Sequence, residues 1–216
     1  MIHRLIDRLA ESYSEGEHKL EAMRAREEYF DRAGKVFDDD AELFEGRMAS
    51  FLEWYLIERR GPDGAPPPVI RALAGDAPSF DFGREERRAL SHVAASHRSL
   101  FELYGAAEHL LDIEDVIGGG RFAVIERRKI FGFSPGDLFE ARLVWDAESD
   151  AVIFGRTFLF HPPDAREEVL DAVDRAVERG SARDEILFVL SRNYVRWHRY
   201  GHVGAAKIYR AGDSST

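Results

Sequence analysis

The chain of 216 residues contains no cysteine, is 44% hydrophobic and 32% charged, and carries a formal net charge of −10. This length and composition fit a globular protein with a well-filled core and argue against a disordered one. The lack of cysteine excludes disulfides, thiolate metal sites and cysteine nucleophiles. The acidic balance disfavours nonspecific binding to nucleic acid or anionic lipid.

The first residues of the chain are interrupted by charges every few positions and contain no apolar core of a signal peptide. The sequence also has no apolar window long enough to span a bilayer. We therefore expect a cytoplasmic protein with no membrane segment.

Two helices are predicted in the N-terminal part, over 2–30 and about 41–60, because apolar residues recur there at helical spacing. The stripe on the first helix consists of Ile2, Leu5, Ile6, Leu9 and Tyr13. Because this stripe begins at the start of the chain, where neighbouring segments need not enclose it, it is a candidate interface for a homodimer.

A glycine- and proline-rich connector over 61–68 is the clearest break in the chain. It separates an N-terminal helical region, 1–62, from a second part, 69–216, which holds a helix, a small β unit and a helical hairpin. The connector is too short for a flexible tether between domains, so we expect both parts to form one compact domain.

A third long helix is predicted over about 84–104, with His97 on its apolar face. On that face a buried, hydrogen-bonded core histidine is the favoured interpretation. The alternative, a catalytic histidine, needs a partner carboxylate that the sequence does not reveal.

The hydrophobic period then changes from 3.6 to 2 between about 107 and 160. The stretches 138–145 and 151–160 alternate and predict a hairpin. The triplet Gly118–Gly120 is interpreted as a turn, since a phosphate loop needs a helix directly after its glycines and here a strand follows. The expected fold class is therefore α+β, with a small curved antiparallel β-sheet or barrel packed against the N-terminal helices and a C-terminal αα-hairpin.

The last helix, over about 182–200, carries the strongest local contrast in charge. Residues 186–210 contain five basic and no acidic residues in an otherwise acidic chain. Arg192, Arg196 and Arg199 fall within about 60° of one another on a helical projection, and Tyr200 lies beside them. This stripe predicts a binding face for an acidic protein partner or an anionic ligand. The alternative is a solvated face that suits the negative end of the helix.

An enzymatic alternative rests on Asp112 or Asp115 with Glu126 and Arg128, whose order is similar to the Asp and Glu-x-Lys pattern of metal-dependent nucleases. Arginine is a poor substitute for the lysine of that pattern, because it does not readily release a proton. His198 and His202 have the spacing of a helical metal pair, but Gly201 is predicted to end the helix between them. We therefore expect no metal site and no cofactor, and favour a non-catalytic binding or regulatory protein over a metal-dependent hydrolase or nuclease.

The segments 51–60, 90–103 and 134–144 resemble an arrangement found in uncharacterised bacterial proteins, some of which carry a SEC-C metal-binding motif. The matching positions are Trp54, Ser99, Phe101, Gly136 and Asp137. The resemblance covers roughly 44–160 and implies a Trp-containing helix, a second helix and a small β unit in a bacterial protein. The SEC-C element itself requires cysteines, so it is absent, and the resemblance brings no catalytic residues.

Overall fold

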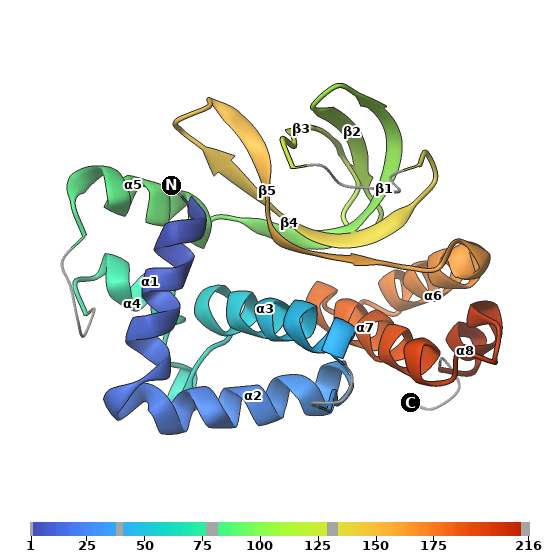
Figure 1. Ribbon diagram of the computed structural model, residues 1–216, viewed down its shortest axis with the longest axis horizontal. Coiled ribbons are helices and arrows are strands. Elements are labelled where there is room, and N and C mark those ends of the chain that lie inside the picture. Colours follow the sequence, from blue (N-terminus) through green and yellow to red (C-terminus); the bar gives the residue numbers. More distant parts are fainter. Residues whose placement is uncertain (1, 38–40, 77–81, 129–133, 213–216) are drawn as a thin grey trace.

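The computed structural model describes residues 2–37, 41–76, 82–128 and 134–212 (Figure 1). It is an α+β protein in which a closed five-stranded barrel lies against two groups of helices, as the sequence predicts. Among the described residues, no helix combines the length and the apolar character needed to cross a membrane.

Five helices form the N-terminal part: α1 (Ile2–Ser14), α2 (Lys19–Ala33), α3 (Ala41–Ile57), α4 (Pro68–Leu73) and α5 (Arg84–Ala94). The single helix expected over 2–30 is wrong, because Gly16 adopts a positive φ of 57° and starts a short 3-10 turn. α2 therefore leaves α1 in a new direction (Figure 1). The apolar stripe of α1 is buried within the chain itself, so this face gives no support to the expected homodimer.

The barrel consists of β1 (His97–Ala107), β2 (Leu110–Asp115), β3 (Arg121–Ile125), β4 (Leu138–Asp146) and β5 (Ala151–Phe160). Its order is β1-β2-β3-β5-β4, closed by pairing of β4 with β1. All neighbours are antiparallel except β3 and β5, which run parallel through Val124 and Val152, so the fully antiparallel sheet expected from the sequence is wrong at this seam. Five-stranded Greek-key barrels include the OB-fold, and a fold of this kind hosts many unrelated functions.

The predicted third helix is wrong after Ala94, because β1 begins at His97. The cause is burial on both faces of the strand. Leu100 packs against the C-terminal helices, whereas Phe101 and Leu103 point into the barrel. A strand buried on both sides gives a continuous apolar run, which periodicity does not separate from a helix.

Three helices close the chain: α6 (Arg166–Glu178), α7 (Arg183–Arg199) and α8 (Ala205–Gly212). α6 and α7 form the expected helical hairpin, and α8 is an addition that the sequence analysis missed. α7 also packs against α2, and its Phe188 joins the hydrophobic cluster of the N-terminal helices. One apolar core therefore includes residues from both sides of the 61–68 connector.

Candidate functional site

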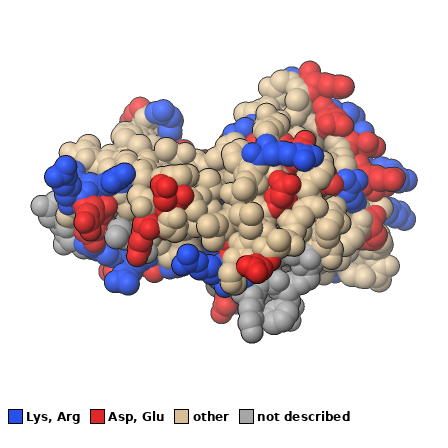
Figure 2. Space-filling view, turned by 90° about the horizontal axis from the view of Figure 1, so that it is seen from above, with Lys and Arg blue, Asp and Glu red and all other residues tan. Residues whose placement is uncertain are grey.

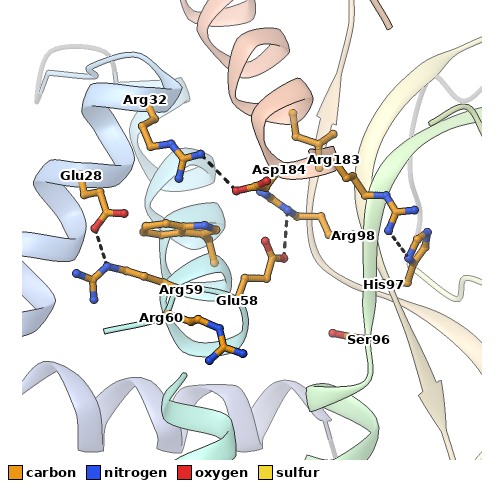
Figure 3. A pocket seen from close by; sticks show the side chains of 12 residues that line it. Glu28, Arg32, Glu58, Arg59, Arg60, Ser96, His97, Arg98, Arg183 and Asp184 are labelled. Carbon is orange, nitrogen blue, oxygen red and sulfur yellow. Dashed lines mark hydrogen bonds and ion pairs between the residues drawn. The ribbon is translucent and has the colours of Figure 1, made fainter. Parts of the chain in front are cut away.

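A cleft of about 540 Å³ lies where the two helical groups meet the start of the barrel. Figure 3 shows its side chains converging from α2, the end of α3, the start of β1 and the first turn of α7. Its lining consists of Glu28, Arg32, Trp54, Glu58, Arg59, Arg60, Ser96, His97, Arg98, Arg183, Asp184 and Leu187. We call this set the arginine cleft.

The charge of the arginine cleft is opposite to that of the whole chain. It is lined by five arginines and three acidic residues, whereas the chain has a net charge of −10. On the face that carries the barrel, by contrast, acidic and basic side chains intermingle (Figure 2). A concave site lined mainly by one sign of charge concentrates ligands of the other sign.

Each of the three acidic residues of the arginine cleft pairs with an arginine of the lining. Glu28 accepts from Arg59 at 2.8 Å, and Asp184 accepts from Arg32 at 3.3 Å. The third pair joins Glu58 to Arg98, with an N···O distance of 3.2 Å. Among the described residues, Arg60 forms no ion pair with an acidic residue of the cleft, and Arg183 pairs only with Asp115, which lies outside the lining, at 3.8 Å. The lining thus holds two more arginines than acidic residues, and one of these arginines, Arg183, shares Asp115 with His97.

Arg98 holds further unused hydrogen-bonding capacity at the floor of the cleft. Its side chain is 12% exposed, and within the described part of the chain its Nη2 atom has no hydrogen-bond acceptor. Burial opposes the charged form, but Glu58 raises the pKa of Arg98, so the guanidinium stays charged. An anionic oxygen reaching Nη2 would satisfy a buried donor that is otherwise unpaired.

A second set of groups in the cleft is built around His97. Its Nε2 atom lies 2.7 Å from Asp115, and its Nδ1 atom lies 3.2 Å from Nη1 of Arg183. Asp115 is buried and also accepts hydrogen bonds from the hydroxyl of Ser99 and from the backbone N–H groups of Ile117 and Gly118. The sequence treated His97 and Asp115 separately, and the β1–β2 pairing brings them together.

The Asp115 carboxyl is held in its ionised form. Burial alone would raise its pKa, but hydrogen bonds from His97, Ser99 and Gly118 lower the pKa of Asp115 to about 2. An ionised carboxylate only accepts hydrogen bonds, so the Nε2 atom of His97 carries a proton and donates it to Asp115.

Gly118 has a steric role beside this cluster. A Cβ atom at this position would lie 2.6 Å from Nη2 of Arg183 and 2.7 Å from Oδ2 of Asp115. Any larger residue would displace one of these groups. The glycine triplet is therefore a turn, as expected, whose first member also leaves room for Arg183.

The alternative metal site at Asp115 and Glu126 does not assemble. Glu126 follows the end of β3 and bonds to His109 beside the start of β2, whereas Asp115 is the last residue of β2. Six positions along a strand separate the two carboxylates by roughly 20 Å. Glu126 is instead paired with Arg128 at 2.6 Å. No group of three or more potential ligands that could hold a metal occurs among the described residues.

The predicted arginine stripe on α7 is only partly available to a partner. Arg192 donates through Nε and Nη2 to the backbone oxygen of Arg32, at 3.0 and 2.8 Å. Arg199 donates to the backbone oxygen of Lys35 and lies over the ring of Phe37. These two arginines thus bind the end of α2 and the segment that follows it. Arg196 and Tyr200 are exposed.

Comparison with known proteins does not indicate a function for the arginine cleft. No family model, curated protein or solved structure matches the chain. The resemblance to SEC-C-containing bacterial proteins therefore stays a prediction, and the function has to be argued from the arginine cleft.

Proposed function

We propose that the protein is a non-catalytic binding protein that takes an anionic small ligand into the arginine cleft. The observation that carries this proposal is the surplus of arginine in the cleft of an acidic chain: five arginines face three acidic residues of the lining, or four when Asp115 beside Arg183 is included. The proposal keeps the ligand charge predicted from the sequence and moves the site from the outer face of α7 to its first turn. The cytoplasmic location and the regulatory role expected from the sequence belong to the same proposal.

The layout of donors favours a small ligand over an extended one. The guanidinium groups converge on one concavity of about 540 Å³, which is the size of a small-molecule site. Guanidinium groups present several N–H donors in a fixed plane, which suits phosphate, sulfate and carboxylate oxygens. A nucleic acid would instead need a basic track along its backbone.

The test uses sulfate as a probe and isothermal titration calorimetry as the measurement. We expect saturable binding to the native protein and at least tenfold weaker binding to the double variant R60Q/R183Q. The variant R4Q/R24Q removes two exposed arginines outside the cleft and is the charge-matched control. Equal weakening in both variants would show a nonspecific effect of net charge and would overturn the proposal.

A second candidate surface is formed by Arg196 and Tyr200 at the end of α7, since both side chains are exposed. This is the remaining part of the stripe that the sequence assigned to an acidic protein partner. If the partner binds there, R196E should abolish its binding while sulfate still binds the arginine cleft with unchanged affinity.

A further inference from the structure

The cluster around His97 contains a conflict that an anion would resolve. His97 lies between Asp115, which attracts a positive charge onto the imidazole, and Arg183, which opposes one. With Asp115 ionised and Arg183 able only to donate, a single arrangement satisfies both contacts. It is the neutral ring, with the proton on Nε2 and the lone pair of Nδ1 accepting from Arg183.

The ring position supports this arrangement and limits its movement. His97 stacks on Phe122 from β3, with ring centroids 6.1 Å apart and planes inclined by 29°. Its side chain is 31% exposed and lines the cleft. The ring therefore keeps its bond to Asp115 while Nδ1 faces the space where a ligand enters.

From this geometry we infer that an oxyanion binds between Arg183 and His97, and that His97 takes up a proton as it does so. The inference rests on the proposed function and deepens it. An anionic oxygen placed between the two groups accepts from Nη1 of Arg183 and from a protonated Nδ1 of His97. Both nitrogens are then donors to one acceptor, and the imidazolium is held between the anion and Asp115.

The charges around the ring favour this proton uptake when the anion is present. The charged groups that face or surround His97 are Asp115 from β2, Arg183 and Asp184 from α7, Glu58, Arg59 and Arg60 just after α3, Arg98 from β1, and Glu28 and Arg32 from α2. Arginines outnumber acids in this set by five to four. An anion reverses the local balance and raises the affinity of His97 for a proton.

The number of unmatched cations also indicates the class of ligand. Arg60, Arg183 and a protonated His97 supply three positive charges, and Asp115, which faces both Arg183 and His97, offsets one of them, so that two remain for the ligand. A doubly charged tetrahedral oxyanion, as in a phosphate monoester, matches this set better than a single carboxylate does. Arginine recognises such oxyanions with parallel N–H bonds.

Sulfate is the probe for the proton uptake, because it keeps two negative charges between about pH 5.5 and about pH 8.5. Any pH dependence of its binding therefore comes from the protein. An uptake that raises the pKa of one histidine by about one unit makes the dissociation constant about tenfold weaker at the upper pH than at the lower. Calorimetry near pH 7 in two buffers of different ionisation enthalpy should show an uptake of up to one proton per sulfate.

The variant H97Q should bind sulfate at every pH with the weaker affinity that the native protein has at the upper pH, and it should take up no proton. H202Q changes an exposed histidine outside the cleft and is the matched control. If H97Q does not fold, NMR titration of the His97 ring in the native protein, with and without sulfate, replaces it. Its pKa should rise by about one unit on sulfate binding.

The outcomes separate the two proposals. Sulfate binding without pH dependence or proton uptake would overturn the role of His97 and leave the arginine cleft as the binding site. Proton uptake that persists in H97Q would overturn it equally. If sulfate does not bind at either pH, both the role of His97 and the proposed function fail. Acetate that binds as tightly as sulfate would overturn the preference for a doubly charged ligand.

Discussion

The two faces of β4 are both buried, yet only the face toward the helices contains charged residues. Toward the barrel interior the strand presents Phe139, Ala141 and Leu143. Toward the helices it presents Glu140 and Arg142, which are 7% and 1% exposed, between the buried apolar residues Leu138 and Val144. The inner face is held by apolar packing, whereas the outer face adds ion pairs and hydrogen bonds to its apolar contacts.

The polar face connects the barrel to the helices at defined positions. Arg142 bonds to Glu58, to Glu53 at 3.4 Å and to the hydroxyl of Ser96 at 3.0 Å. Glu140 accepts from Ser191 of α7 at 3.2 Å, and the same hydroxyl accepts from Arg47 of α3. A buried ion pair adds little net stability, because desolvation offsets the attraction, but losing one partner is costly.

The arginine cleft lies beside the charged residues on the outer face of β4. Glu58 is shared between Arg142, inside the barrel–helix interface, and Arg98, at the floor of the cleft. The cleft is therefore the edge at which the buried polar network reaches solvent. The apolar interior closes the barrel, and the charged residues of the outer face orient side chains that line the arginine cleft.

The largest loss of stability is expected from the apolar face. Phe139 is fully buried and its ring contacts those of Phe101, Phe154 and Phe160. F139A should lower the free energy of unfolding by about 3–5 kcal/mol, through lost transfer energy and the cavity left behind. Urea denaturation measures this. The control L20A, at a residue that is 68% exposed, should change it by less than about 0.5 kcal/mol.

A loss of about 3 kcal/mol is expected when the polar face is broken at Arg142, because Glu53 and Glu58 would remain buried beside a missing charge. R142M should also weaken sulfate binding, since Glu58 would then be paired with Arg98 alone. The same substitution at Arg121, whose pair with Glu114 is exposed, should cost no more than about 0.5 kcal/mol. Equal costs for the two variants would contradict the role assigned to the buried network.

The pH dependence of this loss is set by the carboxylates. Burial raises the pKa of Glu58, but Arg142 and Arg98 outweigh it and lower the pKa below its ordinary value. The stability contributed by the ionised Glu58 is complete at pH values above the ordinary pKa of a glutamate. It is lost as the pH falls through the lower pKa that Glu58 has in the folded protein. The difference between R142M and the native protein should therefore shrink in acid.

The same contrast explains what the sequence could reveal about the fold. Strands that alternate, such as 138–145 and 151–160, were predicted because one face is apolar at period 2. β1 was missed because both of its faces are buried, and a short apolar run at Leu100 and Phe101 also fits a helix. The parallel pairing of β3 with β5 has no local signal, since it depends on barrel closure between residues distant in the chain.

The arginine cleft was less predictable than the fold. Its residues come from positions as far apart as Glu28 and Asp184, and no spacing in the sequence links them. His97 and Asp115 were both marked as candidates, but their contact depends on the pairing of β1 with β2. The basic segment in an acidic chain predicted a binding face for an acidic partner or an anionic ligand, and it placed this face at the end of α7 that lies far from the arginine cleft.

A smaller effect is expected at Ser99, which donates to Asp115. S99A removes one of the bonds that lower the pKa of Asp115, so the pKa should rise from about 2 toward the ordinary value of 3.8. A carboxylate whose pKa is lowered by folding contributes stability at pH values above its ordinary pKa. This stability is lost as the pH falls through its pKa in the folded protein. S99A should therefore cost about 1–2 kcal/mol at neutral pH, with the cost fading between about pH 4 and about pH 2. A cost that does not change with pH would contradict this account.

The smallest effects are expected on the outer face of α7, where the arginines divide into two kinds. Arg192 donates two hydrogen bonds to the backbone oxygen of Arg32 in the last turn of α2. R192M should therefore cost about 1 kcal/mol, because it leaves a helix-end carbonyl without its charged donor. R196M changes an exposed side chain and should stay within about 0.5 kcal/mol of the native protein. Because Arg32 lines the arginine cleft, R192M should also weaken sulfate binding, whereas R196M should not. Urea denaturation and calorimetry on the two variants test both statements. Identical results for R192M and R196M would show that the arginines of α7 are not needed to hold α2 in place.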